Sequence, residues 1–251
     1  MHSAPRGCRP AAPAHRSRNR GTRGRALEGS RYSLAAIRRI CAALPAPGER
    51  TVVLALESPR RAALLVPLVA LGAEAAVVVT RRASSLERHA DDWMFPGGGL
   101  DASDASAAAG AIREASEELG LPRSDFEILG QLDSRGPILS GHRIEVFVAC
   151  ATPSAGWRPA AGEVEEIRAR PLRHFADPAN AYRARMDPGY EIGPVAAGRA
   201  AGFPPELLHL RIGGGAILWG MQAEILAELL VHVDPDGARH LLEQGSPCRA
   251  R

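Results

Sequence analysis

The feature that most constrains this chain is a glycine run followed by an acidic segment, in residues 95–121. The Pro-Gly-Gly-Gly run at its start is typical of a tight loop and not of regular structure. After it, apolar residues recur at helical spacing, at Ile112, Ala115 and Leu119. Gly120 and then Pro122 form a stop signal. The sequence therefore predicts a loop, a helix and a second loop.

Three carboxylates crowd one side of the predicted helix. Glu114 and Glu117 are three residues apart, and Glu118 follows Glu114 by four. Like charges at this spacing repel, and the helix dipole disfavours anions near the C-terminal end. An acidic helix face that is simply solvated is the alternative reading of such a short motif. The adjoining glycine loop and the stop favour a bound Mg²⁺ or Mn²⁺, because these cations prefer carboxylate and carbonyl oxygens.

The stretch resembles the Nudix box, in which a glycine precedes Arg-Glu-apolar-x-Glu-Glu-x-Gly-apolar. One position departs from it: the Glu expected between the glycine and Arg113 is Ala105 when counted back from the Arg, and Asp104 when counted forward from Gly98. An opening with this extra residue is similar to the coenzyme A pyrophosphatase branch of the Nudix hydrolases. The residues that fit this branch are Gly97, Gly98, Asp101 and Asp104.

An extended signature of the same branch precedes the box. Its matching residues are Thr80, Arg82, Leu86, His89, Phe95 and Pro96. The resemblance implies that Arg82, His89 and Phe95 bind substrate; an ordinary loop histidine is the alternative for His89. The branch's Ser, Arg, Gly and Gln are replaced by Ala83, Glu87, Asp91 and Asp92. The charge reversal at Glu87 bears on coenzyme A specificity and leaves the box untouched.

The fold implied by the resemblance is α/β, the Nudix α/β/α sandwich, with a mixed β-sheet between helices. The implied reaction is the metal-dependent hydrolysis of a diphosphate linkage, with Mg²⁺ or Mn²⁺ as cofactor. For coenzyme A or an acyl-coenzyme A the products are adenosine 3′,5′-bisphosphate and the (acyl-)4′-phosphopantetheine. Another nucleoside diphosphate derivative, such as ADP-ribose or a dinucleotide, is the alternative substrate. A catalytically silent Nudix-fold binding protein is the alternative class.

The resemblance also assigns roles within the box. The metal ligands are Gly98 through its backbone, Glu114, Glu117 and Glu118, with Glu163 as a candidate from outside the box and Glu166 in reserve. A solvated strand or loop edge is the alternative for that outer acid. Arg113 orients the glutamates through charge-assisted hydrogen bonds. Either Glu114 or Glu118 serves as the base, and the sequence does not choose between them.

Composition bounds the rest of the chain of 251 residues. Residues 1–30 are rich in Arg, Ala, Pro, Gly and Ser, and we expect a disordered tail in preference to a transit peptide or a nucleic-acid-binding arm. Outside the first 31 residues the net charge is about −4, so we expect no nucleic-acid partner for the folded part. The four cysteines have no metal or disulfide spacing, which fits a reducing compartment and a cytoplasmic location. We expect no membrane partner, a small nucleotide as ligand, and a homodimer as an open alternative.

The expected organisation is a helix and linker in residues 31–60, a Nudix domain in 61–233 and a tail in 234–251. Residues 32–44 have helical spacing and end at Pro45. Strands are expected at residues 61–71, 75–80, 126–132, 143–151 and 207–212. Residues 173–205 are expected to be irregular, a functional loop or lid. The last helix is expected at residues 217–233, after a glycine turn.

Overall fold

The computed structural model describes residues 30–46, 49–50, 60–86, 90–136, 142–185 and 206–242. Its strands are β1 (Glu49–Arg50), β2 (Arg60–Leu71), β3 (Glu74–Arg82), β4 (Trp93–Met94), β5 (Gly97–Gly99), β6 (Phe126–Arg135), β7 (His142–Ala151), β8 (Val164–Pro171), β9 (Ala181–Ala184), β10 (Leu207–Gly213) and β11 (Ala216–Trp219). Its helices are α1 (Leu34–Ala42), α2 (Ala107–Leu119), α3 (Leu172–Phe175), α5 (Gly220–Val233) and α6 (Arg239–Leu242), with short 3₁₀ turns η2 (Arg123–Asp125) and η3 (Pro178–Asn180).

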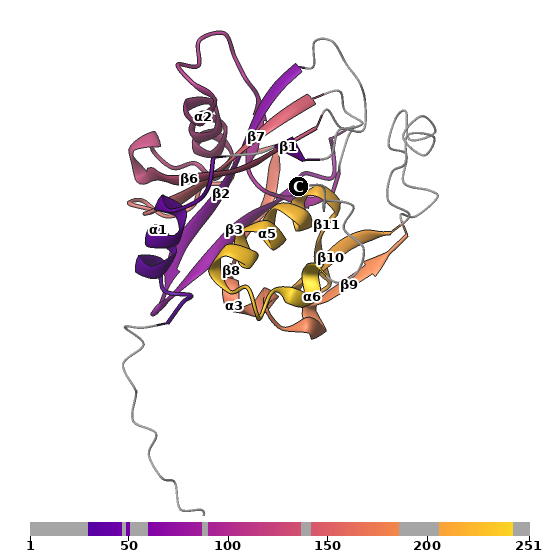
Figure 1. Ribbon diagram of the computed structural model, residues 1–251. Coiled ribbons are helices and arrows are strands. Elements are labelled where there is room, and N and C mark those ends of the chain that lie inside the picture. The colour runs from indigo at the N-terminus through magenta and orange to yellow at the C-terminus, as the bar shows by residue number, and fades with distance from the viewer. Residues whose placement is uncertain are drawn as a thin grey trace, which may run out of the picture.

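The strands form one mixed sheet in the order β1-β6-β7-β2-β3-β4-β11-β10-β9, with β5 beside β2 and β8 beside β3. β2 pairs with β7 in parallel and with β3 antiparallel. β2 and β3 are apolar runs that are buried on both faces, which is the pattern of central strands covered by helices on each side. Figure 1 shows β9 and β10 on the side of the molecule away from α2.

Helices cover both faces of the sheet, and two cores result. Alternate residues of each strand point to opposite faces. One face packs on α2, through side chains such as Ala111, Ala115 and Leu119. The other face packs on α1 and α5, which bury Ile37 and Leu226 (Figure 1). The chain thus has the expected mixed α/β fold, with a mixed sheet between helices.

The predicted N-terminal helix and the predicted strands are present, with small shifts at their ends. Ser33 begins α1, because its hydroxyl accepts a hydrogen bond from the Ala36 backbone N–H at 3.2 Å. Ser106 begins α2 in the same way, bonding to the Ala109 N–H at 3.1 Å. The chain leaves α2 at Gly120, whose left-handed φ of 64° makes it the helix C-cap.

The glycine run is a strand and not the expected loop. β5 (Gly97–Gly99) pairs antiparallel with Ala62–Leu64 of β2. A side chain at Gly97 would place its Cβ 2.3 Å from the Ala63 carbonyl oxygen. Glycine therefore lets this segment approach β2 closely enough for backbone pairing, which its composition alone did not predict.

The last helix also begins later than expected. Residues 216–219 form β11, which pairs antiparallel with β10, and Leu218 pairs with Trp93 of β4. The helix α5 begins only at Gly220. The turn between β10 and β11 has left-handed backbone at Gly214 and Gly215, so it closes a hairpin that requires glycine.

Part of the segment predicted to be irregular has regular structure. Residues 172–184 contain α3, η3 and β9, and β9 pairs with β10. Residues 186–205 lie outside the described residues, and so do residues 1–29 of the tail predicted at 1–30.

Buried side chains continue past the expected end of the domain at Val233. Ala238 and Leu241 belong to the core on the α5 side. The packed structure therefore includes residues of the expected C-terminal tail, up to the end of α6. None of the helices in the described residues is long and apolar enough to cross a bilayer.

Candidate functional site

The centre of the site is the contact between α2 and the glycine strand β5. Gly98 lies under Glu114, so that a Cβ on Gly98 would fall 2.7 Å from the carboxyl carbon of that side chain. Gly98 must therefore lack a side chain if Glu114 is to rest on the backbone there. The Gly97 backbone N–H donates a hydrogen bond to Glu118, one helical turn further along α2. Two of the predicted glutamates thus converge on the same short strand.

Arg113 joins the helix to the segment before it. Its guanidinium donates to both carboxylate oxygens of Asp104, at 3.1 Å each, and to the Gly99 carbonyl oxygen at 3.1 Å. It also donates to Glu114 at 2.9 Å and to Glu117 at 3.4 Å. Arg113 therefore hydrogen-bonds two of the three helix glutamates, Glu114 and Glu117.

Asp104 fits the sequence pattern, but sequence reasoning gave it no role. Its side chain is only 6% exposed, and the hydrogen bond from Arg113 lowers the pKa of its carboxyl. Gly110 of α2 leaves room for it, since a Cβ there would lie 2.8 Å from an Asp104 oxygen. Asp104 therefore holds Arg113 in place from the loop before α2. The sequence signals that could have indicated this role of Asp104 are Gly110 and the extra residue between Gly98 and Arg113.

The three helix glutamates differ in environment. Glu117 is open to solvent, with a side chain that is 56% exposed. Burial raises the pKa of Glu114, although the hydrogen bond from Arg113 opposes it. Glu118 is buried, and burial raises its pKa to about 8, with Arg82 and the Gly97 N–H opposing the shift and Glu114 and Glu163 adding to it.

Glu163 comes close to Glu118 because the loop before β8 caps the end of α2. The backbone N–H of Arg158 donates to the Leu119 carbonyl at 3.0 Å, and that of Ala160 donates to the Glu118 carbonyl at 3.1 Å. These are carbonyls that a helix end leaves unpaired. Glu163 is the last residue before β8, with an exposed side chain near Glu118. The reserve candidate Glu166 lies on the opposite face of the sheet, where it binds Arg168.

The three residues predicted to bind substrate differ in where the structure places them. Arg82 ends β3 on the same side as Glu118, and its Nε is buried without a hydrogen-bond partner among the described residues. The Phe95 side chain follows β4 and is fully buried in the core that packs on α1 and α5, so its ring has no exposed surface to offer a substrate. Its backbone N–H donates to Gln222 of α5 at 3.0 Å. His89 and Glu87 lie outside the described residues.

The donor chemistry of the site fits a hard divalent cation. Asp101, Asp104, Glu114 and Glu117 share the single guanidinium of Arg113, which leaves an excess of negative charge. The side-chain atoms there that could bind a metal are all carboxylate oxygens, the ligands that Mg²⁺ and Mn²⁺ prefer. Within the described residues, no three Asp, Glu, His or Cys side chains lie together at ligand spacing. Glu114 and Glu117 instead hydrogen-bond Arg113, and Glu118 bonds the Gly97 backbone.

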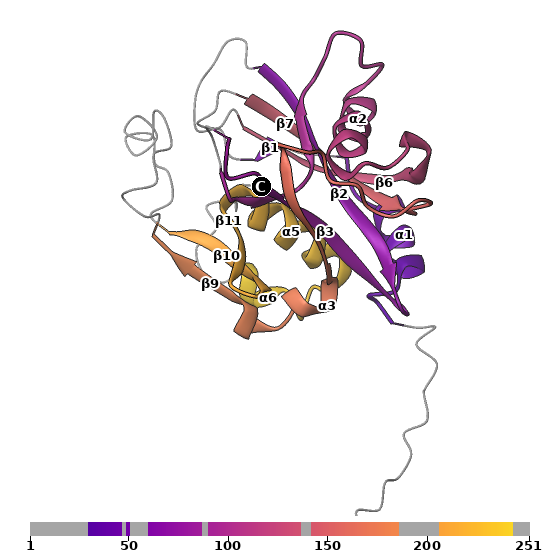
Figure 2. The same cartoon turned by 180° about the vertical axis from the view of Figure 1, so that it is seen from behind.

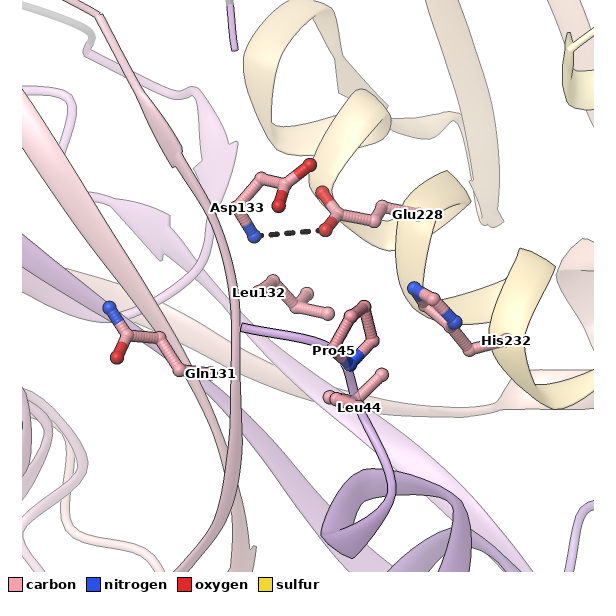
Figure 3. Close-up of a pocket in the computed structure, with 7 residues that line it drawn as sticks. All are labelled: Leu44, Pro45, Gln131, Leu132, Asp133, Glu228 and His232. Carbon is pink, nitrogen blue, oxygen red and sulfur yellow. Dashed lines mark hydrogen bonds between the residues drawn. The ribbon is translucent and has the colours of Figure 1, made fainter. Parts of the chain in front are cut away.

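A cavity on the other side of the sheet is not part of this site. It has a volume of about 90 Å³ and lies between the segment after α1, β6 and α5 (Figure 3). Glu228 in its wall accepts a hydrogen bond from the Asp133 N–H at 2.9 Å and is ion-paired with buried Arg135. Its acidic group therefore serves the packing of α5 on β6.

These features define a mixed α/β fold in which a glycine strand and an acidic helix form one site. The NUDIX domain family model matches residues 59–190. The chain therefore belongs to the Nudix family.

Individual relatives agree with this family. An uncharacterized Nudix hydrolase, NudL, of Salmonella paratyphi B is 35% identical over 113 residues, which are 45% of this chain and 58% of the relative. NudL of Salmonella newport matches to the same extent. The match thus spans less than two thirds of the length of these curated relatives.

Solved structures of the family are more distant in sequence. The MutT/nudix family protein of Enterococcus faecalis has 16% identity and a TM-score of 0.44, covering 83% of this chain and 74% of that one. An Ap4A hydrolase of C. elegans has 19% identity and a TM-score of 0.39, covering 45% of this chain and 81% of that one.

Proposed function

We propose that this Nudix protein hydrolyses the diphosphate linkage of a nucleotide derivative, with coenzyme A or an acyl-coenzyme A as substrate. The observation that carries the proposal is the meeting of Glu114 and Glu118 on the Gly97–Gly98 backbone, beside the unpaired Nε of Arg82. Acidic side chains packed this closely serve no evident structural purpose, whereas a diphosphate and its metal require them.

Each residue of the proposed site has a role that follows from its position. Glu114, Glu117, Glu118 and Glu163, with the Gly98 backbone, would hold Mg²⁺ or Mn²⁺, which supplies charge neutralisation and acidifies water when bound. Arg113, fixed by Asp104, keeps the glutamates oriented. The Arg82 guanidinium binds a phosphate oxygen next to Glu118. Glu114 or Glu118 takes the proton of the attacking water, and the leaving phosphate departs as the bridging P–O bond breaks.

Coenzyme A is the narrower part of the proposal. It rests on the resemblance of residues 80–104 to the coenzyme A branch and on the fit of Arg82 in the site. ADP-ribose is the second candidate, because Glu87, Asp91 and Asp92 replace the Arg, Gly and Gln of the coenzyme A branch signature. A panel of coenzyme A, acetyl-coenzyme A, ADP-ribose and a dinucleotide with Mg²⁺, read by product chromatography, separates the two. Coenzyme A turning over no faster than ADP-ribose would remove the narrower claim.

Replacing one metal-site glutamate tests the site itself. We expect Glu117→Gln to lower kcat by roughly 10²-fold or more, as is typical when a group of a metal site is lost. Glu117 is exposed, so the change should leave the fold intact. The matched control is Glu127→Gln, the same change at a glutamate of β6 with a 60% exposed side chain. Equal rates for the two variants would refute the site assignment.

A further inference from the structure

A second cavity lies on the face of β3 and β8 that is turned away from α2. It has a volume of about 260 Å³ and is lined by Arg81, Trp93, Glu166, Arg168, Gly214, Gly215 and Ala216. Arg81 precedes Arg82 in β3, so the two side chains point to opposite faces of the sheet. The cavity and the acidic site thus share the same end of β3 but not the same face. Figure 2 shows β8 beside β3 at this edge.

The charges in this cavity argue against an anionic ligand. The Arg168 guanidinium donates from Nε to Glu166 at 3.0 Å and from Nη1 to the Gly213 carbonyl at 2.6 Å, and its Nη2 also binds Glu166. Arg81 is paired with Asp91 at 3.0 Å and with Glu165 at 3.3 Å. Three carboxylates therefore surround two guanidinium groups, and all three nitrogens of Arg168 already donate a hydrogen bond within the protein. A phosphate would find a site that is already neutralised.

What Arg168 retains is the flat face of its guanidinium. Its Cζ lies 4.5 Å from the centre of the Trp93 ring, so the two groups are stacked. The bonds to Glu166 and Gly213 hold the guanidinium rigid in this plane. Planar nucleobases stack on Arg guanidinium groups that are fixed in this manner.

The opposite wall leaves room for such a ring. Gly214 and Gly215 form the β10–β11 turn, with φ values of 61° and 79°, and present no side chains to the cavity. A Cβ on Gly214 would lie 3.5 Å from Arg168 Nη1, against the group on which a ring would stack. The cavity is smaller than the roughly 300–1,000 Å³ of sites that enclose a whole drug-sized ligand, so it suits a single ring system.

Glu166 sets the chemistry at the ring edge. Its Oε2 lies 3.7 Å from Arg81 Nε, beyond hydrogen-bond distance, and so keeps acceptor capacity within the cavity. A carboxylate accepts hydrogen bonds, and the ring edge that meets it must donate one. An exocyclic amine, as in adenine, meets this requirement. Unsubstituted purine does not, because the same ring edge carries acceptor nitrogens and no N–H donor.

We propose that this cavity binds an amino-bearing nucleobase, stacked on Arg168 with its amine on Glu166. The choice of a nucleotide ligand rests on the proposed function, which it extends to base specificity. The base belongs either to the substrate or to a separate free nucleotide, and the experiment distinguishes these sources.

The test compares AMP with purine riboside 5′-monophosphate, which lacks only the amine, by calorimetric titration of the full chain without metal. We expect AMP to bind at least about tenfold more tightly, the effect of one hydrogen bond to a charged group. Arg168→Lys keeps the charge and removes the plane, so it should weaken AMP binding at least about tenfold. The matched control, Arg239→Lys on α6, should bind AMP as the unaltered protein does, because Arg239 is 67% exposed. Equal affinity for AMP and purine riboside 5′-monophosphate, or an unchanged Arg168→Lys variant, would overturn the proposal.

A second variant covers the case in which Arg168→Lys does not fold. Glu166→Gln should reduce the preference for AMP over purine riboside 5′-monophosphate, and a preference that stays intact contradicts the proposal. Hydrolysis then identifies the source of the base. If it is the substrate's, Glu166→Gln raises KM for an adenine dinucleotide and not for its unsubstituted-purine counterpart, with kcat retained. If it is a free nucleotide's, both KM values stay unchanged while AMP binding is weakened. AMP binding without any hydrolysis would refute the proposed function and leave the base site standing.

Discussion

At the scale of single residues, Asp91 explains one departure from the coenzyme A signature. Its φ is 62°, and it is the only residue other than glycine with positive φ among those the structure describes. The signature has glycine at this position, where a left-handed backbone is unstrained. Aspartate is among the few other residues that adopt this conformation with some frequency. The substitution therefore preserves the backbone path into β4.

This backbone conformation predicts an order of stabilities. Asp91→Ala should be less stable than Asp91→Gly by about 1 kcal/mol, because alanine pays the steric cost of left-handed backbone and glycine does not. The lost ion pair with Arg81 is common to both variants, since Asp91 is 59% exposed and pairs at the surface. Urea unfolding of the two variants gives the comparison. An Asp91→Ala variant that is as stable as Asp91→Gly, or more stable, would contradict a left-handed backbone at Asp91.

At the scale of elements, the end of α2 and the loop before β8 form one unit. A Cβ on Gly120 would lie 2.1 Å from the Arg158 carbonyl oxygen. The same loop donates backbone hydrogen bonds to the last carbonyls of α2 and then leads into Glu163. The identity of one glycine thus determines whether an acid distant in sequence reaches the helix glutamates.

Gly120→Ala should therefore affect both stability and activity. We expect a loss of roughly 2–3 kcal/mol in the free energy of unfolding, from left-handed strain together with the clash. If Glu163 belongs to the metal site as proposed, its displacement should also lower kcat/KM for the proposed diphosphate substrate.

Gly156→Ala is the matched control for this change. Gly156 has a φ of 74° but no atom within 4 Å of its Cβ position, so it carries the strain without the clash. The difference between the two variants, measured by urea unfolding and initial rates, isolates the contact with Arg158. Identical losses in both would show that this contact has no effect of its own.

At the scale of the whole molecule, Asp234 ties the two ends of the described chain together. Its carboxylate, just after α5, accepts hydrogen bonds from the Tyr32 hydroxyl and the Arg31 guanidinium, which precede α1. It also accepts one from the Gly237 N–H at 3.1 Å. Burial alone would raise the pKa of Asp234, but these hydrogen bonds outweigh burial and lower it.

The lowered pKa gives this link a defined pH dependence. Its stabilisation is complete above the unfolded-state pKa of about 3.9 and is lost as the pH falls through the lower folded-state pKa. We expect Asp234→Asn to cost about 1–2 kcal/mol at pH 7, with the gap from the unaltered protein closing below about pH 4. Thermal or urea unfolding from pH 7 to pH 3 measures it.

The control for the pH series is Asp236→Asn in the same turn. Asp236 is 86% exposed, and its ion pair with Arg239 is at the surface. Its effect should stay within about 0.5 kcal/mol at every pH. A gap for Asp234→Asn that persists at pH 3 would mean that its charge is not what stabilises the link.

The sequence by itself determined the family, the acidic helix and the central strands, since periodicity, glycine and carboxylate spacing are local properties that a chain displays before it folds. It also placed Arg113 beside the glutamates, because they lie on one helix. Long-range contacts decided the remainder. The glycine run became β5 only by pairing with β2, residues 216–219 became a strand only beside β10 and β4, and Phe95 turned into the core. Asp104, Glu163 and the stack of Arg168 on Trp93 acquired their places through packing between segments far apart in sequence, which no local pattern specifies.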